Sequence, residues 1–213
     1  IVTEDGDLED VFIKLTNNKI LKKKKVNISK MELVKNIKQS QIIKKIFIAL
    51  IGTIILAISS KIKIPFYPVP MTMQTFVVLF IGIAFGWKLG IATIALYLFE
   101  GAIGLPVFSG TPEQGVGLIY LMGPTFGYLI GFLVTVFLAG LFSYNNNIFK
   151  NFAKLTLATS FIYLLGVFWL GSLIGWEKPL YKLGVQPFLL AELFKLLLIT
   201  IIVSKVQKIR KII

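Results

Sequence analysis

The sequence predicts an all-α membrane protein with six transmembrane helices and with its N and C termini in the cytoplasm. Hydrophobic residues make up 56% of the 213 positions and charged residues only 15%, and the mean hydropathy is +0.82. Soluble domains are less apolar than this. The apolar stretches are continuous rather than alternating, which favours helices over a β-barrel as the way to cross lipid.

Residues 1–41 are predicted to form a polar cytoplasmic arm, ahead of a six-helix membrane domain at 42–210. The arm starts with acidic residues and continues with a run of four lysines that begins at Lys22. Such a basic run suits contact with anionic lipid at the cytoplasmic surface. No function is assigned to the arm itself.

Six apolar segments of the membrane domain are interpreted as helices. About 20 apolar residues cross a bilayer, and the first segment meets that length. Three prolines between positions 64 and 70 block helix formation after it, so a stiff loop is expected there. The predicted spans are about 42–62, 71–86, 89–104, 118–142, 152–176 and 187–206.

Local residues refine three of these spans. The second and third are short and are separated by Gly86, Trp87 and Lys88, which predicts a tight helical hairpin with Trp87 at the membrane interface. The fourth carries glycines four residues apart from Gly123 onward, which form a smooth face for close helix packing. The sixth begins at Pro187, a residue that suits a first helical turn.

The distribution of basic residues predicts the orientation. In a six-helix arrangement most of the 23 basic residues lie on the side of the arm and the C-terminal tail. The opposite side carries only Lys61, Lys63, Lys178 and Lys182 in its loops. Because cytoplasmic loops are enriched in Lys and Arg, both termini are expected in the cytoplasm. The net charge of +13 is therefore interpreted as a topology signal, and nucleic acid is not an expected partner.

Glu192 and Lys195 are the main candidate functional residues. Both lie inside an otherwise apolar span, where ionisable side chains are costly and mark functional sites. Their spacing of three places them on one helix face. A neutralising pair that only stabilises the bundle is the alternative, although buried pairs rarely stabilise better than apolar residues do.

Other side chains give weaker signals. Gln74, early in the second span, could bond a ligand or another helix, and Tyr128 could supply an apolar wall with a polar tip. The sequence contains no His and no Cys, which removes the usual bases, thiol nucleophiles and zinc ligands. We therefore predict that the protein is not an enzyme and that it has neither a metal site nor a cofactor.

Small residues form a stripe along the first span. Ala49, Thr53 and Ala57 recur every four residues and would let another helix approach closely. Packing within the chain is one interpretation of this stripe, and contact with a partner protein is the other.

Four ordered motifs in residues 42–210 are similar to those of the BioY family, the biotin-specific substrate-binding (S) components of energy-coupling factor (ECF) transporters. They are IPFYPVPMTMQT from Ile64, GAIGLPVFSGTPE from Gly101, GPTFGYLIGF from Gly123 and GVQPFLLAELFK from Gly184. The resemblance implies biotin uptake across the bacterial cell (inner) membrane by a multi-pass protein. The implied partners are a transmembrane T component and two ABC-type ATPases.

The resemblance also implies roles for individual residues. The family has an Asp and a Lys three apart that contact biotin; here Lys195 matches and Glu192 replaces the Asp. The stripe of Ala49, Thr53 and Ala57 resembles the family's contact with the T component. Phe126 stands where the family often has a glycine.

The chemistry of biotin suits these side chains. Its ureido ring has two N–H donors and a carbonyl, its thioether ring is apolar, and its tail is a carboxylate, so a pocket needs an acceptor, a donor and apolar walls. We expect Glu192 to accept from the ureido N–H groups, and Lys195 to bind the ureido carbonyl or the carboxylate. Further lining residues are expected in or near the pocket, with the loop at 108–117 as a lid: Gln74, Gln114, Tyr128 and Phe188.

Two alternatives remain at this point. The chain could be an S component for another vitamin, or a structural or assembly membrane protein that binds no ligand. In the second case Glu192 and Lys195 would affect stability alone.

Overall fold

Helix Gln39–Lys61 opens the part of the chain that the computed structural model describes, which comprises residues 39–64, 67–113 and 115–213. A helix is thus confirmed over the first predicted span, 42–62. The predicted arm, 1–41, lies outside the described residues except for its end. Residues Lys45–Ile213 form one compact unit, and the contacts reported below are those of this unit.

A short antiparallel hairpin follows this first helix, in the segment predicted to be non-helical. β1 (Lys63–Ile64) pairs with β2 (Met71–Thr72), and Lys63 lies opposite Thr72. The prolines at 68 and 70 have no N–H to donate, which restricts how far the pairing can extend. The two strands were not predicted, and they fix the position of the Thr72 carbonyl.

Helix α2 (Gln74–Ala102) turns back on itself at Gly86, whose φ of 74° and ψ of 171° are not helical. Glycine adopts positive φ without steric cost. The Gln74 Nε2 atom donates a hydrogen bond to the Tyr97 hydroxyl at 2.8 Å, whereas a straight helix would hold these residues about 35 Å apart. The two halves therefore lie side by side, which confirms the hairpin predicted from spans 71–86 and 89–104.

The prediction that the fourth span is one helix over 118–142 is wrong in its first part. The structure has a single turn, α3 (Leu118–Leu121), and then α4 (Phe126–Leu141), with non-helical residues between them. Pro124 has no N–H and disfavours a helical conformation at Gly123. The Gly123 carbonyl instead accepts a hydrogen bond from the Trp169 indole at 2.9 Å.

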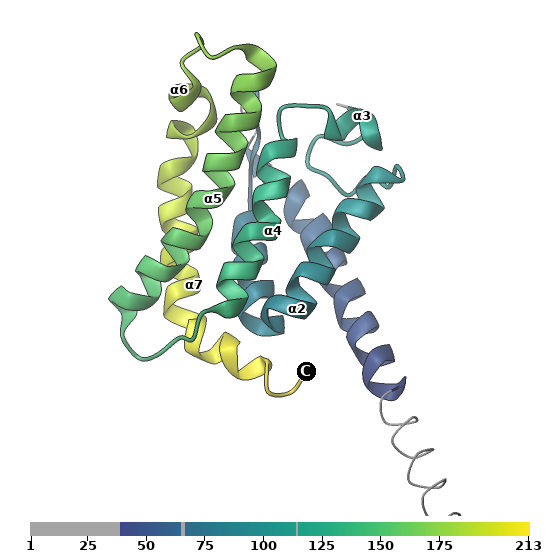
Figure 1. Cartoon of the computed structure of the whole chain (residues 1–213), viewed down its shortest axis with the longest axis vertical. Coiled ribbons are helices and arrows are strands. Elements are labelled where there is room, and N and C mark those ends of the chain that lie inside the picture. Colours follow the sequence, from purple (N-terminus) through teal and green to yellow (C-terminus); the bar gives the residue numbers. More distant parts are fainter. Residues whose placement is uncertain (1–38, 65–66, 114) are drawn as a thin grey trace, which may run out of the picture. The chain divides into compact units, whose positions relative to one another are not determined.

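Helix α4 packs between α2 and α5 (Figure 1). A Cβ atom at Gly127 would collide with the backbone of Leu165, and one at Gly131 with the backbone of Ile162. The glycine spacing thus lets α4 and α5 approach at backbone distance, as the sequence predicted.

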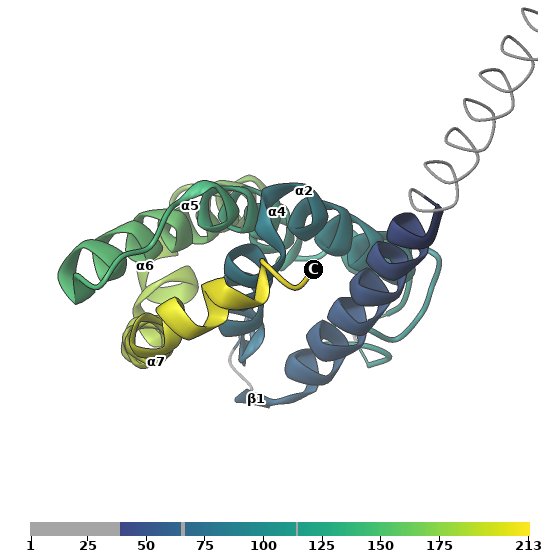
Figure 2. The ribbon, with the colours of Figure 1, turned by 90° about the horizontal axis from the view of Figure 1, so that it is seen from below.

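The C-terminal half of the unit forms a helical pair, α5 and α7. Helix α5 (Ile148–Ile174) begins earlier than the predicted 152, because the Asn147 side chain caps it by accepting from the Lys150 N–H at 3.0 Å. A turn, α6 (Leu180–Gly184), and a 3-10 turn, η1 (Gln186–Phe188), lead to α7 (Leu189–Ile209). Helices α5 and α7 pack together, and both views show them side by side (Figures 1 and 2).

The end of α7 reaches the turn of α2. The Arg210 guanidinium donates to the carbonyl oxygens of Gly82 and Ile83, at 3.1 Å and 2.8 Å, just ahead of the bend at Gly86. In Figure 2 the C-terminal end of the chain passes α2. Arg210, which follows the last residue of α7, thus ties the end of this helix to the turn of α2.

Four helices in the described part of the chain are long and apolar enough to cross a membrane: Gln39–Lys61, Gln74–Ala102, Ile148–Ile174 and the stretch Leu180–Ile209. Helix α4 is apolar but shorter. Two clusters of buried hydrophobic side chains fill the unit, one that includes Phe108, Phe132 and Phe188, and one that includes Leu155 and Ile199. The first cluster surrounds the cavity described next.

Candidate functional site

A buried ion pair lies at one end of a cavity within the bundle. The Lys195 ammonium is 2.8 Å from Glu192 Oε2, and each side chain is only 5% exposed. Both residues come from the first turns of α7, where a spacing of three places them on one face. The sequence prediction that they share a face is confirmed.

Three donors converge on the same oxygen of Glu192. Besides Lys195, the hydroxyls of Thr75 on α2 and Tyr163 on α5 each donate to Oε2 at 3.0 Å. This convergence compensates a carboxylate that burial would otherwise disfavour. The other oxygen, Oε1, is buried and has no hydrogen-bond partner in the described part of the structure. Glu192 therefore keeps one acceptor unused.

Lys195 has no such spare capacity. Its ammonium also donates to Thr75 Oγ1 at 2.6 Å and to the Thr72 carbonyl of β2 at 3.1 Å. An ammonium has three hydrogens, and three acceptors lie within bonding distance. The pair is thus asymmetric, since the cation is fully hydrogen-bonded and the anion is not.

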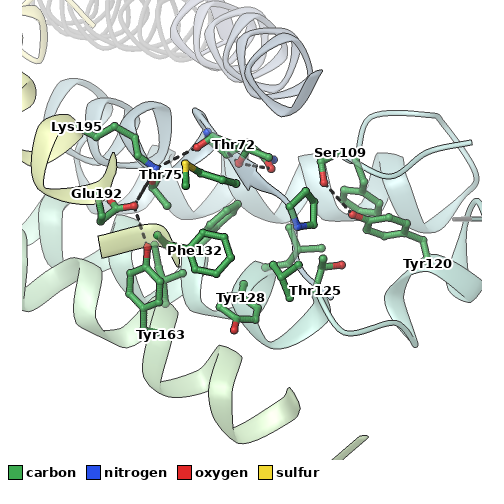
Figure 3. Close-up of a pocket in the computed structure, with 18 residues that line it drawn as sticks. Thr72, Thr75, Ser109, Tyr120, Thr125, Tyr128, Phe132, Tyr163, Glu192 and Lys195 are labelled. Carbon is green, nitrogen blue, oxygen red and sulfur yellow. Dashed lines mark hydrogen bonds and ion pairs between the residues drawn. The ribbon is translucent and has the colours of Figure 1, made fainter. Parts of the chain in front are cut away.

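The cavity runs from this ion pair to a second polar group, with apolar side chains between them (Figure 3). Phe132 and Leu129 of α4 are among the apolar residues of its wall. At the far end the hydroxyls of Ser109 and Tyr120 lie 3.2 Å apart. The cavity has a volume of about 60 Å³, on a scale where one water needs roughly 10 to 15 Å³. It thus has two polar ends and a hydrophobic middle.

The other predicted lining residues occupy different places. Gln74, Tyr128 and Phe188 do line the cavity, but Gln74 bonds the Tyr97 hydroxyl at 2.8 Å and Tyr128 donates to the Gly184 carbonyl at 2.9 Å. Tyr128 therefore offers its ring rather than its hydroxyl. Gln114 lies outside the described residues.

The sequence alone missed two residues that contact the carboxylate, Thr75 and Tyr163. Thr75 follows Gln74 directly, so its proximity was available as a signal. Tyr163 lies in the middle of α5, and only the packing of α5 against α7 brings it to Glu192. A tyrosine inside an apolar span was the one clue to it.

Two residues of the small-residue stripe on the first helix are buried within this chain, and the third is partly buried. Ala49 is 7% and Thr53 2% exposed, and Ala57 packs against the buried cluster around the cavity. The Thr53 hydroxyl also donates to Glu100 at 3.0 Å. These contacts favour the interpretation of internal packing, and a role of the stripe in partner binding stays a prediction. Within the described residues, no group of three or more acidic, His or Cys side chains could hold a metal ion.

Helices long and apolar enough to cross a membrane, packed around a cavity with a buried ion pair, are typical of an integral membrane protein. The family model described as the BioY family matches residues 25–212. The chain therefore belongs to the BioY family.

Similar proteins agree with this assignment. A protein of Pyrococcus horikoshii named "Probable biotin transporter BioY" is 34% identical over 71% of this chain and 88% of its own length. The "Biotin transporter BioY" of Thermotoga maritima is 34% identical over 74% of this chain and 92% of its own length. A crystal structure of the S-component for biotin from an ECF-type ABC transporter aligns with a TM-score of 0.66 and 28% identity, over 79% of this chain and 93% of that one.

Proposed function

We propose that this chain is the biotin-binding S component of an ECF-type ABC transporter and takes part in biotin uptake across the cell membrane. Membership of the BioY family and the named functions of the similar proteins support this function. The chain acts as a transport component and not as an enzyme. The observation that carries the ligand assignment is the unpartnered oxygen of Glu192.

Biotin lies in the cavity with its ureido ring at α7. Its N–H donors supply what Glu192 Oε1 lacks, and buried polar groups are almost always hydrogen-bonded in folded proteins. An ionised acceptor strengthens such a bond relative to a neutral one. Glu192 is therefore the main polar contact of the ligand.

The rest of biotin fits the remaining wall of the cavity. The apolar thioether ring packs against Phe132 and the rings of Tyr128 and Phe188, and the carboxylate tail extends toward the hydroxyls of Ser109 and Tyr120. Hydroxyl groups can donate hydrogen bonds to a carboxylate. Lys195 exchanges one of its protein acceptors for the ureido carbonyl, or acts through Glu192 by holding its charge.

We also propose that the domain crosses the membrane six times, with the two halves of α2 as short crossings. The termini and the basic arm then face the cytoplasm and anionic lipid, as the distribution of Lys and Arg supports. The chain works with a T component and two ABC-type ATPases, and it does not bind nucleic acid. In a bacterial cell it resides in the cell (inner) membrane.

The proposal is tested by calorimetry on the purified protein in detergent, with biotin, desthiobiotin, riboflavin and thiamine as ligands. Saturable binding that is selective for biotin is expected. Selective binding of riboflavin or thiamine would assign the chain to another vitamin. A folded protein that binds none of them would support the structural or assembly role instead.

A further inference from the structure

The segment at residues 107–111, here called the lid segment, is held over the cavity mainly through its backbone oxygens. Phe108 and Ser109 of this segment line the cavity. Phe108 is 1% exposed, and its ring stacks on Tyr120 with centroids 4.8 Å apart. The segment therefore forms one wall of the ligand site, at the end where Ser109 meets Tyr120.

Two lysines of the preceding elements bind this segment from outside the cavity. The Lys61 ammonium, at the end of the first helix, donates to the carbonyls of Phe108 and Thr111 at 2.8 Å and 2.9 Å and to the Thr111 hydroxyl at 3.1 Å. The Lys63 ammonium, on β1, donates to the Ser109 carbonyl at 2.7 Å. Neither lysine lines the cavity in the described structure.

We propose that Lys61 and Lys63 are positioning residues that latch the lid segment closed and so set the rate at which biotin leaves. This inference rests on the proposed function. Bonds from a charged donor are stronger than neutral ones, and four of them converge on residues 108–111. A ligand in the cavity leaves past this wall only after these bonds break, because the lysines tie the wall to the first helix and to β1.

The absence of cysteine from the sequence permits a clean test. Lys61→Cys introduces the only thiol, which is then modified with 2-aminoethyl methanethiosulfonate to restore an ammonium, or with ethyl methanethiosulfonate to add a neutral chain. Dissociation of tritiated biotin is followed by a chase with unlabelled biotin. Lys178→Cys, in the connection between α5 and α6, receives the same reagents as the matched control.

Loss of the ammonium is expected to raise the dissociation rate about tenfold, a size that fits charge-assisted bonds at a partly exposed site. The aminoethyl reagent restores slow release and the ethyl reagent does not, while the control stays unchanged throughout. The association rate does not fall, because Lys61 makes no part of the cavity wall. If Lys61 had a purely structural role, the two reagents would give the same dissociation rate.

Lys63→Met serves as the second variant, in case Lys61→Cys folds poorly. It removes one bond to the lid segment and is expected to raise the dissociation rate by about threefold. If biotin binds but neither variant changes its release, the latch is wrong and the proposed function stands. If the unmodified protein binds no biotin, both proposals are overturned.

Discussion

Lys195 and Lys61 both have an ammonium with three oxygen partners, yet the partners differ in kind. Lys195 is buried, at 4% exposure, and one of its partners is a carboxylate. Lys61 is exposed, and its partners are two backbone carbonyls and a hydroxyl. The kind of partner therefore depends on whether the ammonium is buried or exposed.

A charge that has lost its water needs an opposite charge, because dipoles alone do not repay the desolvation. A charge on an exposed side chain keeps part of its hydration, so oriented carbonyl dipoles are enough. The first arrangement stores an ionised acceptor where a ligand can use it. The second arrangement ties two segments together and leaves the ligand site free of charge at that end.

The largest effect is expected for Glu192→Gln, which removes the anion from the buried pair. Lys195 would keep its charge without compensation, which costs about 3 kcal/mol of unfolding free energy. Biotin affinity is expected to fall at least about a hundredfold. Calorimetry measures the biotin affinity and thermal unfolding in detergent measures the stability. Glu177→Gln, in the exposed α5–α6 connection, is the control. Unchanged affinity would remove Glu192 from the ligand site.

A double variant, Glu192→Gln with Lys195→Met, separates charge compensation from ligand contact. Without either charge the bundle is expected to regain about 2 kcal/mol relative to Glu192→Gln alone. Biotin binding is not expected to return, because the amide has one neutral acceptor oxygen in place of two charged ones and the ionised acceptor is still missing. Thermal unfolding and calorimetry are carried out on the unchanged protein, on Glu192→Gln, on Lys195→Met and on the double variant. These four proteins form a double-mutant cycle. Recovery of binding would show that the pair is structural only.

Tyr163→Phe removes one neutral donor from Glu192 and leaves both charges in place. Loss of a hydrogen bond to a charged group is worth about 1.5 kcal/mol, so biotin affinity is expected to fall roughly tenfold. Tyr181→Phe, at an exposed tyrosine in α6, serves as the matched control in calorimetry. Equal affinities for the two variants would mean that the Tyr163 hydroxyl does not support the acceptor.

The smallest effect is expected for Thr53→Ala, at a carboxylate contact that involves no lysine. The variant loses the hydrogen bond to Glu100 and about 1 kcal/mol of stability, and biotin affinity is expected to stay the same. Thermal unfolding and calorimetry provide the comparison. A loss of biotin-stimulated assembly with the T component, at unchanged stability, would instead favour the partner-binding interpretation of the stripe.

Much of the helical arrangement could be predicted from residues whose effect is local. Gly86 and its neighbours predicted the hairpin because positive φ at a glycine needs no distant contact. Pro124 is the counterexample, since the apolar run around it masked a break that its missing N–H produces. Apolar composition indicates burial in lipid but does not show where a helix is interrupted.

The part of the site that lies on a single helix could be predicted from the sequence. Glu192 and Lys195 are three residues apart, so helix periodicity alone placed them together. Thr75 and Tyr163 come from other helices, and a single sequence contains no signal for which helices meet. The same limit applies to Lys61, because two of its three partners are backbone carbonyls, which have no side-chain signature.

The bond between Arg210 and the turn of α2 has a consequence for biosynthesis. The carbonyls of Gly82 and Ile83 precede their guanidinium partner by 128 and 127 residues. During translation the hairpin therefore leaves the ribosome long before Arg210 is made. Its turn reaches this set of hydrogen bonds only after α7 and Arg210 have been made, so a late helix stabilises the turn of an earlier one.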